Sequence, residues 1–537
     1  MSNRRLLTAF AAVCLSASLA LAGCSGSPAG SSPESGSSQP AAQGTGTSTA
    51  PSGEASATSG ETAPTQGNET QAPGESEAPV KTSPATTKAT SGGDKPGDSV
   101  LEQTDKYASD NLPKKDMNKF VLRVGTTDKT LLKNLTDEKD GAVNSLRYEK
   151  LAEIEKRFNC TIQPVLYEYG KAAERFSALI LSGASGSVPH VLLSSAWEAG
   201  NLMAGNLLQD FGQLKHVDAD APWWNQSMAE ASRIGGKTYL MLSELTRPST
   251  RSWGVMYNKK IAKEIGLDEA TLTTLVNNKQ WTWDKFIEYA KKAVKDTNGD
   301  GKFTEKDRWG FASPRTDLTY ALMAAGGADF IVNSGGKMTY GLNNDHAITV
   351  LEKMNAIVTK EGIRFPTENN TAQRQAAEDE QVLFYLYTYT GMMDMIEDLG
   401  DHGLLPMPIG PGQKDYYGLV DHNVEVITIP KTNKDLENTG ILLEALSFAD
   451  WKLLPDIVEE YTYTVFDEDD KLSPAVLSNI FDQAVVNPAL YNDTTAFITA
   501  CKRPILDAVA TANSDISGTV AAIRNSTQAA IDDFFNQ

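Results

Sequence analysis

The chain has 537 residues, and its 69 Asp and Glu outnumber its 49 Lys and Arg, giving a formal net charge of -20. This charge argues against nucleic acid or another acidic polymer as the main partner, because like charges repel, and it fits a neutral or cationic ligand. Hydrophobic residues make up 40% of the chain, which allows a large core but not a polytopic membrane protein.

The first 23 residues have the pattern of a secretory signal peptide. Arg4 and Arg5 precede an apolar stretch at 6–22 that ends in small residues before Cys24. The order Leu-Ala-Gly-Cys resembles the lipobox of bacterial lipoproteins, which implies that Cys24 becomes the mature N-terminus and carries acyl chains. These chains would hold the exported protein at the membrane. An ordinary signal peptide with a chance cysteine is the alternative.

A tether is predicted at residues 24–115. Residues 25–100 contain no Phe, Trp or Tyr and are dominated by Ser, Gly, Thr, Ala, Pro and Gln. Such a segment cannot bury enough apolar surface to offset the entropy lost on folding. A flexible chain of this length reaches about 50 Å on average. This reach would clear a thick cell wall and suggests a Gram-positive bacterium.

From about residue 118 the sequence alternates between strand and helix patterns. Strands are predicted at 120–125, 161–166 and 188–194, and helices at 144–158 and around 176–180. This alternation is typical of an α/β fold in which helices cover a mainly parallel sheet. Ligands of such sheets bind beyond the carboxyl ends of the strands. Those ends carry Thr127 and Asp128 after the first strand, and Ser195 and Trp197 after the third.

Several short phrases farther along the chain resemble one protein family. They lie at 181–183, 188–191, 204–210, 236–239, 256–260, 264–267, 281–286, 380–389 and 403–411. Their order and spacing resemble the extracellular solute-binding proteins of ABC importers, family 1, the carbohydrate-binding group that contains the maltose-binding protein. The resemblance covers about residues 118–450. The chain departs from the family at 384–389, where Phe-Tyr-Leu-Tyr-Thr-Tyr replaces the usual Gly-Pro-Trp.

The resemblance implies a type II periplasmic-binding-protein fold with two α/β lobes that close on a ligand like a hinge. Lobe 1 is expected at 116–248 and about 380–424, and lobe 2 at 249–379 and about 425–537. The implied ligand is a carbohydrate, most simply an oligosaccharide, and the implied partner is an ABC permease. The receptor is expected to be a monomer.

A sugar offers C–H faces that pack on aromatic rings and hydroxyls that need donors and acceptors. Aromatic and polar residues at strand ends and at the expected crossings between lobes therefore become candidates. Packing in the core is the alternative for each aromatic residue, and an exposed loop is the alternative for each acid. The predicted ligand-binding residues are Thr127, Asp128, Ser195, Trp197, Trp224, Arg251, Trp253, Tyr387, Tyr389 and Asp421.

Residues 296–307 match the twelve-residue calcium loop of an EF-hand. A helix pattern enters the loop, but a strand or loop pattern leaves it, so only half of an EF-hand is present. A Ca²⁺ affinity of about 10⁻⁴ to 10⁻³ M and a structural role are expected. A polar turn without metal is the alternative. The predicted ligands are Asp296, Asn298, Asp300, the Lys302 carbonyl, Thr304 and Asp307.

Catalytic signatures are missing from the sequence. It contains no G-x-S-x-G, H-E-x-x-H, G-x-x-x-x-G-K-S/T or C-x-x-C motif. Cys160 and Cys501 remain after the signal peptide and Cys24, and their pairing is left open. The sequence favours a lipid-anchored receptor and not an enzyme. The alternatives are an exported enzyme acting on polysaccharide and a sugar-sensing partner of a membrane kinase.

Overall fold

The fold is seen in a computed structural model that describes residues 103–127, 142–183, 186–334, 337–393, 395, 399–466 and 469–535. The predicted signal peptide, Cys24, the predicted tether up to residue 102, and Asp128 lie outside these residues. The predicted end of the tether at residue 115 is corrected, because Thr104 and Asp110 are buried and Arg157 pairs with Asp110. All described residues belong to one unit that begins at Thr82. Two four-stranded sheets organise this unit, and each forms the centre of one lobe.

The sheet of lobe 1 has the order β13-β3-β1-β2. Strands β2 and β3 pair in parallel with β1, and β13 pairs antiparallel with β3, so the sheet is mainly parallel, as predicted. Its strands are β1 (Phe120–Thr126), β2 (Cys160–Leu166), β3 (Val191–Ser195) and β13 (Glu425–Thr428). The helices around it are α4 (Ala142–Phe158), α5 (Ala172–Leu181), α6 (Ala196–Ala204), α7 (Gln226–Ala231) and α15 (Leu436–Lys452).

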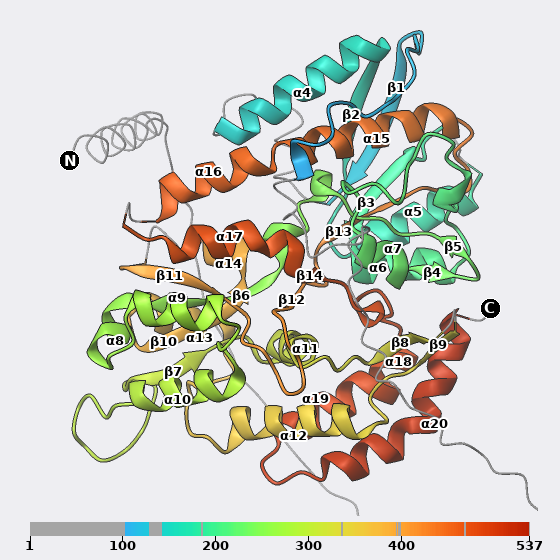
Figure 1. The fold of residues 1–537 in the computed structure, drawn as a ribbon. Coiled ribbons are helices and arrows are strands. Elements are labelled where there is room, and N and C mark those ends of the chain that lie inside the picture. Colours follow the sequence, from blue (N-terminus) through green and yellow to red (C-terminus); the bar gives the residue numbers. More distant parts are fainter. Residues whose placement is uncertain are drawn as a thin grey trace, which may run out of the picture. The chain divides into compact units, whose positions relative to one another are not determined.

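Strand β3 is buried on both of its faces. All five of its residues are buried. Val191 and Leu193 pack in one hydrophobic cluster with residues of α4 and α15, whereas Leu192 packs in the other with residues of α5 and α6. Side chains of a strand alternate between its two faces, so both faces of the sheet are covered by helices. Helices α4 and α15 contact each other, and Figure 1 shows both near β1 and β2 at the top of the view.

The sheet of lobe 2 has the order β11-β6-β10-β7. Strand β6 runs antiparallel to both neighbours, and only β7 and β10 are parallel, so this sheet is mixed and not mainly parallel. Its strands are β6 (Trp253–Asn258), β7 (Trp309–Ala312), β10 (Val382–Thr388) and β11 (His402–Pro406). The helices before β11 are α8 (Lys259–Glu264), α9 (Glu269–Asn277), α10 (Trp283–Ala293), α11 (Arg315–Ala325), α12 (Asp345–Thr359), α13 (Asn370–Glu378) and α14 (Tyr389–Met393).

The C-terminal part of the described chain is mainly helical, and most of it belongs to lobe 2. Helix α17 packs on β11, and α19 and α20 pack with α12 (Figure 1). Its elements are α16 (Leu454–Val465), α17 (Leu472–Gln483), β14 (Ala484–Val485), α18 (Thr495–Phe497), a π-helix (Ile498–Lys502), α19 (Arg503–Ala510) and α20 (Ile516–Phe535). Three small ladders complete the fold: β4 (Arg233–Ile234) with β5 (Lys237–Thr238), β8 (Ile331–Ser334) with β9 (Lys337–Tyr340), and β12 (Gly418–Leu419) with β14.

The strand pairing corrects the predicted lobe boundaries. Residues 380–424 were expected in lobe 1, but β10 and β11 both pair with β6 in lobe 2. Strand β13, expected in lobe 2, pairs with β3 in lobe 1. The chain therefore crosses between the lobes at 243–252, at 407–424, and again along α16, which contacts both α4 and α17. The apolar pattern at 382–388 is compatible with either sheet. Strand pairing, and not composition, therefore decides to which lobe this segment belongs.

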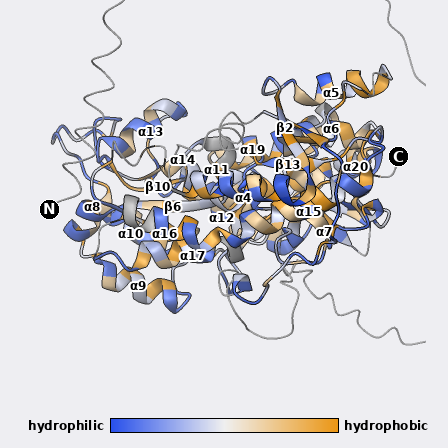
Figure 2. Cartoon of the chain, turned by 90° about the horizontal axis from the view of Figure 1, so that it is seen from above, coloured by the Kyte–Doolittle hydropathy of each residue, from blue (hydrophilic) through white to orange (hydrophobic). Residues whose placement is uncertain are grey.

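In Figure 2, hydrophilic colour marks α8 at the left-hand edge of the view, whereas hydrophobic colour is seen around β13 in the right half. No helix within the described ranges is long and apolar enough to cross a membrane.

Cys160 and Cys501 are both buried free thiols, which answers the pairing question left open by the sequence.

Candidate functional site

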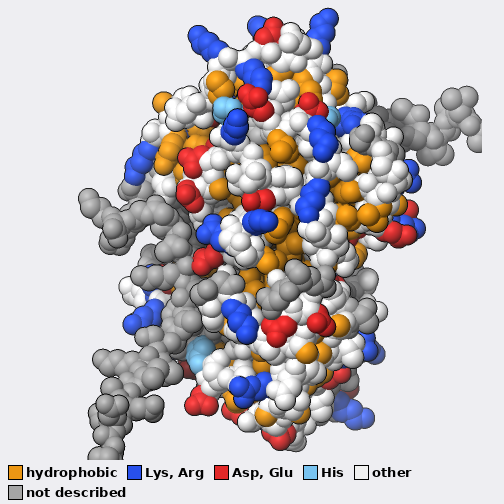
Figure 3. Space-filling model, turned by 90° about the vertical axis from the view of Figure 1, so that its right-hand side faces the viewer, with side chains coloured by type: hydrophobic (Ala, Val, Ile, Leu, Met, Phe, Trp, Pro, Cys, Tyr) orange, Lys and Arg blue, Asp and Glu red, His pale blue; other side chains and the backbone are white. Residues whose placement is uncertain are grey.

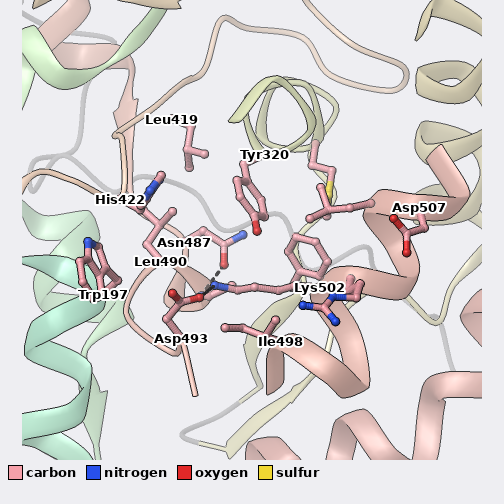
Figure 4. Close-up of a pocket in the computed structure, with 15 residues that line it drawn as sticks. Trp197, Tyr320, Leu419, His422, Asn487, Leu490, Asp493, Ile498, Lys502 and Asp507 are labelled. Atoms are coloured by element: carbon pink, nitrogen blue, oxygen red, sulfur yellow. Dashed lines mark hydrogen bonds and ion pairs between the residues drawn. The ribbon is translucent and has the colours of Figure 1, made fainter. Parts of the chain in front are cut away.

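A cavity of about 460 Å³ lies where side chains from both lobes meet (Figure 4). It is lined by Trp197, Tyr320, Met323, Phe330, Leu419, His422, Asn487, Ala489, Leu490, Asp493, Ile498, Lys502, Arg503, Leu506 and Asp507. Its volume lies in the range of small-molecule sites, and its lining combines apolar and aromatic side chains with a few polar groups. Of the predicted ligand-binding residues that the structure describes, only Trp197 belongs to this lining.

Trp197 provides an aromatic wall on the lobe 1 side. It stands in the first turn of α6, directly after the carboxyl end of β3. The ring of Tyr169 packs against it edge to face, with centroids 6.1 Å apart, and the Tyr169 hydroxyl donates to Oδ1 of Asn423 at 2.6 Å. Tyr169 is 56% exposed, so the pair presents aromatic surface to solvent at this edge of the sheet.

Tyr169 was missed by the sequence reasoning, although the same rule could have found it. It lies three residues after β2, and the carboxyl ends of parallel strands meet at one edge of a sheet. The prediction examined the ends of the first and third strands and left out the second. The structure brings the residues that follow β2 and β3 together.

Glu425 ties the ends of β1 and β3 to each other. Its Oε1 accepts from the Thr127 main-chain N–H at 2.8 Å and from the Thr127 hydroxyl at 2.6 Å, and its Oε2 accepts from the Thr126 hydroxyl at 2.9 Å. In the strand register, Glu425 faces Ser195. Ser195 is 1% exposed, so this predicted ligand contact is buried under the site rather than open to it.

The lobe 2 side of the cavity is built by Tyr320, Met323 and Phe330 and by a segment near the C-terminus, residues 484–507. Pairing of β14 with β12 places its start beside the second crossing. Its π-helix, Ile498–Lys502, ends just before Pro504, which has no N–H to bond to the Ala500 carbonyl. The Thr527 hydroxyl donates to that carbonyl instead, at 3.0 Å. The widened turn ends at Lys502, whose side chain lines the cavity (Figure 4).

Lys502 is almost fully buried and forms an ion pair with Asp493. Its Nζ lies 2.8 Å from Oδ1 of Asp493, and it stands 5.7 Å from the ring centroid of Tyr320. Burial lowers the pKa of Lys502, while the Asp493 carboxylate acts in the opposite direction. The pair places a hydrogen-bond donor and an acceptor side by side at the cavity wall.

A second polar pair lies beside this one. Asn487 lines the cavity, and its Nδ2 donates to Oδ1 of Asp329 at 2.6 Å, while its Oδ1 accepts from the Ala489 N–H at 2.8 Å. Burial raises the pKa of Asp329 to about 6. Asn487 is 8% exposed, so these contacts hold its amide in one orientation at the cavity wall.

Trp224 is a core residue of lobe 1, which corrects its predicted place at the ligand. It is 1% exposed, and its Nε1 donates to Oε2 of Glu444 at 2.9 Å. The neighbouring Trp223 donates to Oε1 of the same carboxylate at 3.0 Å. Burial raises the pKa of Glu444 to about 7. The tryptophan pair therefore holds a buried acid.

Trp253, Tyr387 and Tyr389 pack around the first crossing and do not line the cavity. Trp253 is 2% exposed and packs edge to face on Tyr387, with ring centroids 5.7 Å apart. Tyr389 is 1% exposed and begins α14, so it does not continue the alternation of β10. Its hydroxyl donates to the Leu405 carbonyl at 3.4 Å. The burial of Trp253 and Tyr389 corrects the prediction that these two residues face the ligand, whereas Tyr387 is half-buried and its contact with a ligand stays a prediction.

Arg251 and Asp421 lie where the first two crossings meet. The Asp421 N–H donates to the Arg251 carbonyl at 2.9 Å, and Ser252 forms a bridge with Val420. The Asp421 carboxylate accepts from the Asn423 N–H at 2.7 Å. Neither predicted residue lines the cavity, but the loop that Asp421 shapes carries His422, which does.

The predicted calcium loop folds as a compact turn after α10. Oδ1 and Oδ2 of Asp296 accept from the N–H groups of Gly299 and Gly301, at 2.7 and 2.8 Å. Asp307 is fully buried, and its two oxygens accept from the N–H groups of Thr297 and Thr304. These contacts lower the pKa of Asp307, with the Thr304 bond contributing most.

Asp296, Asn298 and Asp300, at positions 1, 3 and 5, carry the oxygen atoms that a calcium loop needs. The carboxylate of Asp307, at position 12, does not come together with theirs. In the described part of the chain, no three His, Cys, Asp or Glu side chains come together in a way that could hold a metal ion. Asp307 accepts hydrogen bonds from N–H groups of its own loop instead. Calcium binding by residues 296–307 stays a prediction.

Comparison with known proteins gives the chain a family. The profile described as bacterial extracellular solute-binding protein matches residues 141–458, more than half of the chain. A comparison with curated proteins finds no match.

Solved structures share the fold at low sequence identity. UspC of M. tuberculosis matches with a TM-score of 0.54 at 14% identity, covering 76% of this chain and 100% of that one. A cyclic alpha-maltosyl-1,6-maltose binding protein from Arthrobacter globiformis matches at 0.53 and 15%, covering 77% and 99%. A cyclo/maltodextrin-binding protein, solved with maltotetraose, matches at 0.52 and 16%, covering 78% and 98%. These likenesses show a two-lobed α/β fold of the type II binding-protein class.

Proposed function

Because the chain belongs to the family of bacterial extracellular solute-binding proteins, we propose that it is the carbohydrate receptor of an ABC importer. Members of this family bind solutes and do not transform them, so the chain is a binding protein and not an enzyme. The observation that carries the sugar proposal is the cavity that joins aromatic Trp197 to the polar groups of Asn487, Asp493 and Lys502.

The chemistry of the cavity suits a sugar. A pyranose presents C–H faces, which the indole of Trp197 can cover, and hydroxyls, each of which needs a donor and an acceptor on burial. Lys502 supplies a donor, Asp493 an acceptor, and the fixed amide of Asn487 supplies both kinds. The sugars named for two proteins of the same fold, maltotetraose and a cyclic maltosyl-maltose, add support at the level of fold.

Binding is proposed to act through closure of the lobes. Trp197 belongs to lobe 1, and Lys502 and Asn487 belong to the C-terminal segment that packs with lobe 2. A sugar that contacts both sides has differential affinity for the closed form and shifts the population toward it. The permease would then recognise the closed form and receive the solute.

Lipid anchoring at Cys24 completes the proposal. The lipobox-like Leu-Ala-Gly-Cys supports acylation, and the Ser- and Gly-rich composition of the residues that follow supports a tether at the outer face of a Gram-positive cell membrane. Mass spectrometry of the protein extracted from membranes would find an acylated peptide beginning at Cys24. A mature N-terminus elsewhere, without lipid, would refute the anchor and leave the receptor proposal standing.

A screen of ligands tests the receptor proposal. Purified protein is mixed with mono- and oligosaccharides, and saturable binding is measured by calorimetry and thermal shift, with chromatography of the sugar afterwards. We expect binding that leaves the sugar unchanged. Release of new reducing ends would favour the alternative of a polysaccharide-active enzyme. The sensory alternative binds sugar in the same way, so uptake of labelled sugar by cells with and without the gene separates it.

The variant Trp197→Ala tests whether the indole contributes to sugar binding. Loss of a stacking indole is expected to weaken sugar binding by about 1–3 kcal/mol, roughly 5- to 150-fold. Phe303→Ala is the control, because Phe303 is a large aromatic residue, 51% exposed, that stands in the 296–307 loop and does not line the cavity. Equal affinity in both variants would remove Trp197 from the site.

A further inference from the structure

A short segment, residues 484–493, which we call the strap, touches both lobes. Its first part, β14, contacts α7 of lobe 1, and the 3-10 turn that follows, Pro488–Leu490, contacts β8 of lobe 2. Its residues Asn487, Leu490 and Asp493 line the cavity (Figure 4). After the strap the chain continues through α18 and the π-helix into α19, which packs on α12. The strap is therefore anchored in lobe 2 and reaches across to lobe 1.

Tyr491 contacts helices of both lobes. Its side chain is fully buried, and its hydroxyl donates to the carbonyl of Ala231, the last residue of α7 in lobe 1. Its ring packs on those of Phe534 and Phe535 near the end of α20, with centroids 6.3 and 6.0 Å away. Helix α20 packs with α12 and α19 in lobe 2. One tyrosine side chain thus joins a helix of lobe 1 to a helix of lobe 2.

Helix α6 of lobe 1 carries a glycine where the strap crosses it. A Cβ on Gly200 would lie 1.7 Å from the carbonyl oxygen of Tyr491, so only glycine allows the two main chains to approach this closely. Gly200 stands three residues after Trp197, about one turn farther along the helix that provides the aromatic wall. The Val486 N–H also donates to Oγ of Ser227 on α7, at 2.8 Å. Two hydrogen bonds and a close main-chain contact therefore join the strap to lobe 1.

Opening of the lobes must break some of these contacts, because a hinge motion turns lobe 1 away from lobe 2. Since the chain continues from the strap into α19, the contacts with α6 and α7 are the ones that separate. Figure 3 views the molecule from its right-hand side, and hydrophobic side chains gather in the middle of that face, with charged side chains of both signs around them. The contacts of the strap are made between protein groups alone, so they favour the closed arrangement whether or not a solute is bound.

We propose that the strap holds the lobes together independently of the solute, and that opening requires it to lift from α6 and α7. Residues 484–493 lie beyond residue 458, where the match to the family profile ends, so this device stands outside the matched region. Because a solute enters and leaves through the open form, release of the strap would limit the rate of solute exchange. This consequence rests on the proposed function, whereas the strap itself does not.

The distance between the lobes tests the strap in the full-length protein without sugar. Spin labels are attached to p-acetylphenylalanine incorporated at Ala178 on α5 and at Ala522 on α20, which are both exposed, so that the cysteines stay untouched. Double electron–electron resonance then gives the distribution of distances between the labels. We expect the wild type to show mainly the distance of the arrangement in Figure 1.

The double variant Ser227→Ala, Tyr491→Phe removes both hydrogen bonds between the strap and lobe 1. The Val486 N–H and the Ala231 carbonyl then lack a partner unless the strap lifts and water reaches them. A second, longer distance should therefore appear, with the ratio of open to closed form raised at least about tenfold. Gly200→Ala pushes the strap away by steric overlap and should lengthen the distance in the same way.

The control is the double variant Ser232→Ala, Tyr389→Phe, which loses one serine and one tyrosine hydroxyl whose bonds stay within a lobe. The Ser232 hydroxyl donates to the Leu240 carbonyl in lobe 1, and the Tyr389 hydroxyl donates to the Leu405 carbonyl in lobe 2. Its distances should match those of the wild type, and circular dichroism verifies each fold.

Two results would overturn the strap. One is a wild type that already shows mainly the longer distance, and the other is a folded Ser227→Ala, Tyr491→Phe variant that shows only the wild-type distance. An equal change in the control would likewise remove the strap as the cause of closure. Because every measurement is made without sugar, these results leave the carbohydrate receptor proposal to its own ligand screen.

Discussion

Glu425 accepts hydrogen bonds from both the N–H and the hydroxyl of Thr127, a residue 298 positions earlier in the chain. This contact joins the start of the strand that returns from the second crossing to the end of the first strand of lobe 1. It is buried, since Glu425 is 7% exposed. The Glu425 carboxylate therefore braces the edge of the lobe 1 sheet at which the solute is proposed to bind.

Glu425→Gln should lower the free energy of unfolding by about 1–3 kcal/mol. The amide nitrogen of Gln cannot accept, so at least one of the Thr126 or Thr127 donors is left buried without a partner. Urea denaturation followed by circular dichroism measures the loss. Glu437→Gln is the control, because Glu437 is an exposed residue paired with Lys115, and its removal should change stability by no more than about 0.5 kcal/mol. Equal stability of the two variants would refute the bracing role of Glu425.

Two buried acids of lobe 1 predict greater stability in mild acid than in mild alkali. Burial raises the pKa of Glu244 and of Glu444 from the usual 4.5 to about 7. Since the folded-state pKa exceeds the unfolded one, folding takes up protons. The stabilisation is complete below pH 4.5 and is lost as the pH rises to 7, on the order of 3 kcal/mol for each group.

Thermal unfolding between pH 5 and 8 measures this dependence, which we expect to be weaker in Glu444→Gln. Gln carries no titrating proton, so its contribution does not change with pH, although one of the two indole N–H groups loses its acceptor. A melting temperature that rises steadily from pH 5 to 8 in the wild type would contradict the prediction.

The sequence predicted the fold better than the site. Strand and helix patterns predict the α/β class correctly because they report burial, which repeats locally along the chain. Trp253 and Tyr389 were placed at the ligand because of their position near a crossing. Which face of a crossing strand is covered depends on pairing with β10 and β11, however, and no local pattern contains that information.

The part of the cavity that is lined by residues 484–507 could not be predicted from the sequence, for a related reason. Lys502 and Asp493 come into place through a π-helix before Pro504 and through the pairing of a two-residue strand, β14, with β12. Such short elements leave almost no periodic trace. Lys502 in the sequence is one lysine among many, and only its burial marks it as unusual.

Gly254 is predicted to be irreplaceable at the first crossing. A Cβ at this position would lie 2.4 Å from Cζ of Tyr389 and 2.5 Å from its hydroxyl oxygen, and the ring is buried and cannot withdraw. Gly254→Ala should destabilise the protein by about 1–3 kcal/mol through overpacking. Gly186→Ala is the control, since a Cβ there meets no atom within 4 Å. Calorimetric melting of the two variants checks the difference, and a Gly254→Ala protein as stable as the wild type would show that Tyr389 can move.

We propose that the 296–307 loop binds calcium weakly. Asp296, Asn298 and Asp300 stand at the ligand positions of such a loop, whereas Asp307 would have to leave its bonds to Thr297 and Thr304 before it could coordinate. Millimolar CaCl₂ should therefore raise the melting temperature by a few degrees relative to EDTA, because an ion that binds only the folded state stabilises it by mass action.

Asp300→Asn separates coordination from loop structure. Its side chain keeps an oxygen that can accept from the Lys302 N–H, as Asp300 does at 2.8 Å, but it removes one negative charge from the loop. We expect the variant to melt like the wild type in EDTA and to lose most of the calcium-dependent rise. MgCl₂ at the same concentration is the ionic control and should have less effect, because magnesium demands a stricter geometry. Identical melting of the wild type in EDTA and in CaCl₂ would leave residues 296–307 as a turn held by its own hydrogen bonds.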